Sequence, residues 1–129
     1  MRSHGLASQL VTMSVEQTQR TLDRYFDLMG KDEDFAECFS ADVTWLIADT
    51  EEVVRGPSAV RSYILALHAR MADSRGRKTV VGDDYVYLEG DCAASVPDNG
   101  SRINYCIAYT VKGDQITAMR CYGLGAVET

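Results

Sequence analysis

From Lys78 to the end of the chain, apolar and polar residues alternate with a period of two, and this pattern constrains the fold more than any other. Such alternation is typical of strands with one buried face. Turn signals at Glu89-Gly90-Asp91, Pro97-Asp98-Asn99-Gly100 and Lys112-Gly113-Asp114 divide this part of the chain into four segments. The short connections predict an antiparallel meander.

The third of these segments has two faces of different composition. One face is apolar and aromatic: Ile103, Tyr105, Ile107, Tyr109 and Val111. The other carries small side chains: Asn104, Cys106, Ala108 and Thr110. Because the second face is small rather than charged, we expect it to be covered as well. A second subunit is the simplest cover, so the sequence predicts a homodimer through the outer face of the sheet.

A first helix is predicted before the meander. Ser14 is a good N-cap, with Gln17 three residues later as in a capping box. Apolar residues then follow helical spacing until Gly30 ends the segment. We therefore expect a helix from Ser14 to Gly30, preceded by a flexible tail over residues 1–13.

A strand and a second helix are expected next. Asp42 to Ala48 is rich in β-branched and aromatic residues, which favour a strand. Gly56-Pro57 marks a helix start, and the helix is expected to end between Ser74 and Gly76. The charged run from Arg70 to Lys78 is then interpreted as a solvated helix end and loop.

Helices first and strands afterwards predict one α+β domain over residues 14–125, with a C-terminal tail over 126–129. In this prediction a strongly bent antiparallel sheet wraps around the N-terminal helices as a cone. The space between the helices and the sheet can stay open as a ligand pocket.

Composition excludes some partners. The net charge of −6 argues against nucleic acid and against an anionic membrane surface, because both need clustered Lys and Arg. No apolar run reaches the length of a transmembrane helix. The four cysteines form no C-x-x-C pair and have no histidine at metal-ligand spacing, so we expect buried thiols, a cytoplasmic location and neither metal nor cofactor.

Three motifs in this order resemble the nuclear transport factor 2-like superfamily, which includes ketosteroid isomerases and SnoaL-like polyketide cyclases. The motifs are "DRYFDLMGKDEDFAECFSADVTW", "VVRGPSAVRSYI" and "YTVKGDQITAMRCYGLG". The resemblance covers Ser14 to about Gly125. It implies a cone-shaped α+β fold, whereas the reaction varies widely within the superfamily.

The resemblance also implies site residues. Ketosteroid isomerases use a tyrosine of the first helix as an oxyanion donor, and Tyr25 matches it. Their general base falls on Ile47 in this chain, and their second, protonated acid falls on Ile107. Because losing a general base typically costs about 10²–10⁴ in rate, standard isomerase activity is disfavoured.

Other branches of the superfamily are matched no better. SnoaL-like cyclases and limonene epoxide hydrolases use an acid in the last strand, where this chain has Met119 to Leu124 without one. Scytalone dehydratases need two pocket histidines. Here only His4 and His68 exist, and His4 lies in the predicted tail.

Asp49 and His68 are the candidate proton carriers that remain. Asp49 lies two residues beyond Ile47, so a continuing strand would point it to the same face; the alternative is a solvated turn residue. His68 adjoins Leu67 at the edge of the helix's apolar stripe, and imidazole titrates near neutral pH. The alternative is an ordinary boundary histidine.

The predicted pocket wall is largely apolar and aromatic: Trp45, Ile47, Tyr63, Leu67, Tyr105, Ile107, Tyr109, Met119 and Cys121. The same residues could instead fill a solid core. Two function classes stay open. One is an isomerase-, cyclase- or lyase-type enzyme acting on a small hydrophobic, cyclic or carbonyl-bearing molecule. The other is a non-catalytic module that binds such a molecule or a protein.

Overall fold

The computed structural model describes residues 2–94 and 102–125. Two helices, a short 3₁₀ turn and six strands follow one another along the chain: α1 (Arg2–Gly30), η1 (Phe35–Cys38), β1 (Phe39–Ile47), β2 (Glu52–Arg55), α2 (Pro57–Arg70), β3 (Met71–Val81), β4 (Tyr85–Ala94), β5 (Ile103–Lys112) and β6 (Gln115–Tyr122). The predicted turn at Pro97-Asp98-Asn99-Gly100 and the predicted tail over 126–129 lie outside the described residues.

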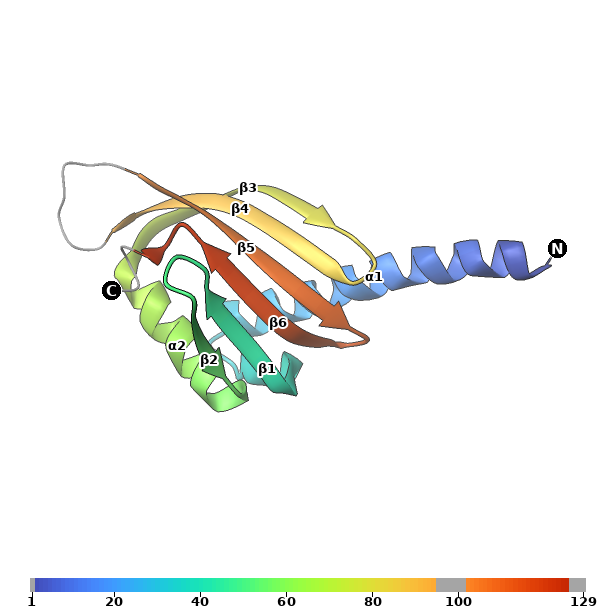
Figure 1. The fold of residues 1–129 in the computed structure, drawn as a ribbon, viewed down its shortest axis with the longest axis horizontal. Helices are drawn as coiled ribbons and strands as arrows, with labels where there is room; N and C mark the ends of the chain where they lie inside the picture. Colours follow the sequence, from blue (N-terminus) through green and yellow to red (C-terminus); the bar gives the residue numbers. More distant parts are fainter. Residues whose placement is uncertain (1, 95–101, 126–129) are drawn as a thin grey trace.

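The six strands form one curved sheet in the order β2-β1-β6-β5-β4-β3 (Figure 1). β3 to β6 pair antiparallel in chain order, as the meander prediction required. The sheet is mixed rather than wholly antiparallel, because β1 pairs parallel with β6. Both helices lie along one side of the sheet, and the core fills the space between them. The predicted α+β class, with a bent sheet against N-terminal helices, is confirmed.

The first helix begins at Arg2, so the predicted start at Ser14 is wrong. No proline lies between Arg2 and Ser14 to stop a helix there, and a good N-cap residue is also tolerated inside one. Further along, α1 is tied to two hairpins. The Thr18 hydroxyl donates to the carbonyl of Asp83 at 2.8 Å, and the Thr21 hydroxyl donates to that of Gly113 at 3.3 Å.

The second helix ends earlier than predicted, at Arg70, because Met71 is already extended and pairs with Ala94. The charged run is therefore strand β3 and not a loop. The sequence pattern concealed this strand because the β3–β4 register shifts twice, between Ala72 and Arg75 and again before Lys78. A register shift of one residue breaks a period-two pattern.

The arginines of this run have a partner that the sequence did not identify. The carboxylate of Asp91 on β4 is nearly buried and is held by Arg102 Nε at 2.7 Å, Arg75 Nη2 at 3.0 Å and Arg77 Nη1 at 2.6 Å. The hydrogen bond from Arg102, with further contributions from Arg75, lowers the pKa of Asp91 from 3.8 to about 2. Two arginines of β3 and Arg102, which directly precedes β5, thus join β3 to β4 and to the segment before β5.

The predicted turn at Glu89-Gly90-Asp91 is also wrong, because β4 continues through it and the chain reverses instead between Val81 and Tyr85. Gly90 serves close approach rather than a turn. A Cβ at this position would lie 2.6 Å from the carbonyl oxygen of Arg75 and 2.7 Å from the hydroxyl of Tyr105. Glycine here makes room for a side chain of the concave face.

Candidate functional site

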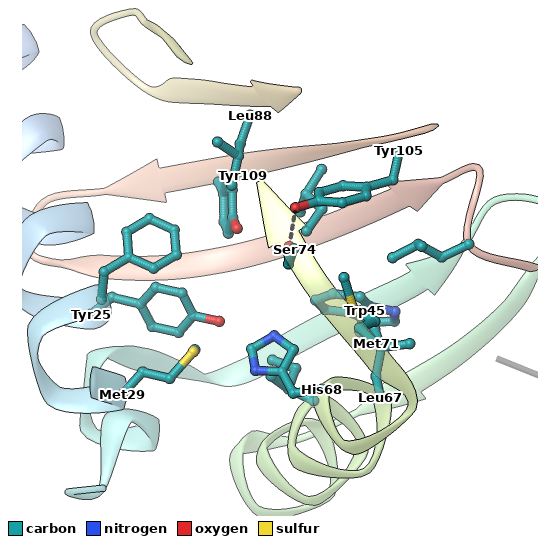
Figure 2. Close-up of a pocket in the computed structure, with 14 residues that line it drawn as sticks. Tyr25, Met29, Trp45, Leu67, His68, Met71, Ser74, Leu88, Tyr105 and Tyr109 are labelled. Atoms are coloured by element: carbon teal, nitrogen blue, oxygen red, sulfur yellow. Dashed lines mark hydrogen bonds between the residues drawn. The ribbon is translucent and has the colours of Figure 1, made fainter. Parts of the chain in front are cut away.

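A cavity of about 300 Å³ lies between the helices and the concave face of the sheet (Figure 2). This is near the lower end of the roughly 300–1,000 Å³ of ordinary ligand pockets. Its wall is mainly apolar, and it is formed by these residues: Tyr25, Phe26, Met29, Trp45, Ile64, Leu67, His68, Met71, Ser74, Leu88, Tyr105, Ile107, Tyr109 and Leu124.

Two tyrosine hydroxyls face the cavity without a protein partner. Tyr25 of α1 and Tyr109 of β5 are almost fully buried, their rings are 6.1 Å apart, and Figure 2 shows both hydroxyls turned toward the cavity. Neither hydroxyl makes a hydrogen bond within the described part of the chain. Burial raises the pKa of Tyr25 and that of Tyr109, with a smaller contribution to Tyr25 from Cys38 and to Tyr109 from Tyr25. Both stay protonated at neutral pH and are available as donors.

A third tyrosine of the wall is already engaged. The hydroxyls of Tyr105 and Ser74 lie 2.7 Å apart and form a hydrogen bond across the rim. The absence of a side chain at Gly90 leaves room for the Tyr105 ring. Tyr105 therefore shapes the wall, while Tyr25 and Tyr109 supply the free donors.

His68 is the basic group of the site. It projects from the last turns of α2 to the cavity, with one side open to solvent. Contact with the apolar wall lowers the pKa of this imidazole below its ordinary 6.5, because desolvation disfavours the charged form. At neutral pH His68 is uncharged and can accept a proton. No carboxylate belongs to the cavity wall over residues 2–94 and 102–125.

Asp49, the other candidate base, lies elsewhere. Strand β1 ends at Ile47, so the alternation that would have turned Asp49 toward the pocket stops before it. Its carboxylate instead accepts hydrogen bonds from the backbone N–H groups of Gly123, at 3.1 Å, and Gly125, at 2.9 Å. Asp49 holds the segment after β6 and is not part of the cavity wall.

The other predicted wall residues separate into three groups. Trp45, Leu67, Ile107, Tyr105 and Tyr109 line the cavity. Ile47, Met119 and Cys121 are buried but belong to the packed core beside it. Tyr63 packs against Trp45 with ring centroids 5.8 Å apart. The Tyr63 hydroxyl and the Trp45 indole N–H are both buried without a partner among the described groups.

Seven wall residues were not predicted: Phe26, Met29, Ile64, Met71, Ser74, Leu88 and Leu124. Met29 and Ile64 lie in the two predicted helices, so only their access to the cavity was missed. Met71 was expected in the second helix and lies instead at the start of β3. Ser74 and Leu88 were hidden by the wrong boundaries of β3 and β4. Leu124 follows the last strand and had no periodic signal.

Neither a metal-ligand cluster nor a membrane-spanning helix is found over residues 2–94 and 102–125. No group of three or more His, Cys, Asp or Glu side chains there could hold a metal ion. None of the helices described is both long and apolar enough to cross a bilayer.

Two helices against a curved six-stranded sheet define a cystatin-like α+β fold. The chain belongs to the SnoaL-like domain family, whose pattern matches residues 22–119. The family assignment confirms the resemblance seen in the sequence. No curated protein sequence matches the chain.

Several solved structures share this fold. A steroid delta-isomerase from Pseudomonas aeruginosa has a TM-score of 0.72 at 12% identity, covering 86% of this chain and 85% of its own. An NTF2-like protein from Burkholderia xenovorans LB400 has a TM-score of 0.66 at 17% identity, covering 88% and 97%. A de novo designed protein with a curved β-sheet has a TM-score of 0.69 at 15% identity, covering 88% and 92%. At these identities the likeness extends to the fold alone.

Proposed function

We propose that this protein binds a small, apolar, uncharged cyclic molecule whose carbonyl oxygen accepts hydrogen bonds from Tyr25 and Tyr109. The observation that carries the proposal is the pair of buried, protonated hydroxyls, which face an apolar cavity and lack partners in the described chain. A buried donor without a partner costs free energy, and a ligand acceptor removes that cost.

The lack of charged groups in the cavity wall also favours an uncharged ligand. Apart from His68, which is uncharged at neutral pH, no ionisable amine, guanidinium or carboxylate lines the described cavity. A charged ligand would lose its hydration without gaining a counter-charge. A carbonyl accepts hydrogen bonds at a much lower desolvation cost, so a ketone fits the site better than a carboxylate does.

The test compares a ketone with its hydrocarbon counterpart. Isothermal titration with acetophenone and ethylbenzene should show tighter binding of acetophenone. Tyr25→Phe should lower the affinity for acetophenone by about 2- to 10-fold, because a net hydrogen bond is worth about 0.5–1.5 kcal/mol. The affinity for ethylbenzene should not change. Tyr87→Phe, on the opposite face of the sheet, is the matched control and should change neither. If Tyr25→Phe lowers the affinity for both ligands equally, Tyr25 does not bind the ligand carbonyl and that part of the proposal is wrong.

A second candidate function is proton transfer on the bound ketone, with His68 as the base. The lowered pKa of His68 and its place on the cavity wall favour this candidate. A proton removed from the carbon next to the carbonyl would pass to the imidazole. The enolate oxygen that forms would be stabilised by the hydrogen bonds from Tyr25 and Tyr109.

We also propose a homodimer through the outer sheet face. Support comes from exposed tyrosines of that face, Tyr87 beside Ala108 and Tyr122 beside Cys106. Light scattering at micromolar concentration should give twice the 14.3 kDa chain mass. Tyr87→Glu should give a monomer, whereas Leu65→Glu, equally exposed on α2, should not. A monomer mass for the unaltered chain contradicts the dimer.

The cysteines support the proposal of a reducing, cytoplasmic location. Each of the four is a free thiol, and Cys38, Cys92 and Cys121 are buried. Burial raises the pKa of each of these three thiols, which keeps them protonated and unreactive at neutral pH.

A further inference from the structure

A second hollow adjoins the cavity and is not used by the proposed function. This groove of about 250 Å³ lies between α1 and the β3–β4 pair. Phe26 and Leu88 line both the groove and the cavity. These two side chains therefore form the boundary between the two spaces; Phe26 is 41% exposed and Leu88 is half-buried.

The walls of the groove are fixed in place. The hydrogen bond from Thr18 to Asp83 ties α1 to the β3–β4 hairpin. The Thr21 hydroxyl shares its proton between the carbonyl of Gln17 in α1, at 3.0 Å, and that of Gly113 in the β5–β6 hairpin, at 3.3 Å. Both threonines are buried, so water does not compete for these bonds. These contacts place α1 beside both hairpins, with the groove between α1 and the β3–β4 pair.

The chemistry of the groove is that of a channel for hydrocarbon. Leu22 and Val86 form a buried apolar floor, with Val81 beside them. The rim is polar. There Gln19 donates a hydrogen bond to Asp23 at 2.9 Å, and Thr79 faces them from β3. Asp23 is the charged side chain of the described lining, which disfavours an anionic occupant.

We propose that the groove holds an uncharged alkyl chain of the same ligand whose ring and carbonyl occupy the cavity, and that the chain passes between Phe26 and Leu88. This inference rests on the proposed function, because it extends the ligand of that site. It makes the ligand an elongated ketone with an apolar chain. The exposed ring of Phe26 and the half-buried side chain of Leu88 would then be covered when the ligand binds.

A chain-length series tests the proposal by isothermal titration with acetophenone, 4′-butylacetophenone and 4′-hexylacetophenone. We expect the affinity to rise by about 2-fold per methylene, half of the roughly 4-fold that complete burial gives, because the groove is open to solvent. Thr79→Trp fills the groove from β3 and should abolish the rise in affinity with chain length. The affinity for acetophenone itself should not change. Gln19→Trp, from the helix side, should act in the same way.

Val80→Trp is the matched control, since Val80 neighbours Thr79 and pairs with Tyr87 on the outer face. It should keep the full rise with chain length. If acetophenone binds but the longer ketones bind no better, or if Thr79→Trp and Val80→Trp respond alike, the groove proposal is wrong and the cavity proposal stands. If none of the three ketones binds the unaltered protein, the proposed function fails and the groove proposal falls with it.

Discussion

Replacing Gly123 by alanine is expected to lower the free energy of unfolding by about 3 kcal/mol, from left-handed strain of roughly 1–2 kcal/mol and overpacking of roughly 1–3 kcal/mol. Gly123 has φ +95°, which L side chains rarely adopt. A Cβ would also lie 2.2 Å from the carbonyl oxygen of Asn104, so the backbone of β5 must shift. Urea denaturation followed by circular dichroism measures the loss.

Gly113→Ala separates the two causes. Gly113 has φ +63°, but a Cβ there would meet nothing within 4 Å. Only the conformational strain remains, so the expected loss is about 1 kcal/mol. Equal losses for the two variants would show that the contact with Asn104 relaxes at no cost.

The concave face of β5 shows what the sequence could predict. Side chains alternate strictly along a strand, so the positions of Tyr105, Ile107 and Tyr109 on one face required only the period of two. Tyr25 was identified by the family motif, since helical spacing alone does not distinguish a pocket residue from a core residue. These four side chains line the cavity.

Asp49 and Gly90 show the limits of sequence reasoning, although the structure bears out the alternative given for Asp49, an exposed turn residue. Both predictions used local signals, strand alternation for Asp49 and turn preference for Gly90. Both residues contact partners that are distant in the sequence. Asp49 accepts hydrogen bonds from the N–H groups of Gly123 and Gly125, and Gly90 lies close to Tyr105. A sequence without its fold gives no access to contacts between segments so far apart, and such contacts override local preference.

The limits of the cavity were beyond prediction for a related reason. Trp45 and Ile47 share one face of β1 and are both buried, yet only Trp45 reaches the cavity. Whether an apolar side chain borders empty space or a neighbour depends on how the volumes of several elements fit together. Residue type and spacing do not report that fit.

The last prediction concerns His68 and has the largest expected effect. With acetophenone bound, the protein should exchange the ketone's methyl protons for deuterium in D₂O, and His68→Gln should slow this by about 10²–10⁴, the usual contribution of a general base. The base acts when uncharged. Since desolvation lowers the pKa of the His68 imidazole below its ordinary 6.5, the rate should rise with pH through that lowered pKa and then reach a plateau. Proton NMR of the methyl signal measures the exchange.

Two variants make the result specific to His68. Asp49→Asn should leave the exchange rate unchanged, because Asp49 binds backbone amides outside the cavity. His68→Gln should still bind acetophenone with nearly the native affinity, since the carbonyl is held by Tyr25 and Tyr109. If Asp49→Asn loses the exchange and His68→Gln keeps it, the base has been misassigned. Tight binding of acetophenone without any exchange by the unaltered protein would favour the non-catalytic binding module.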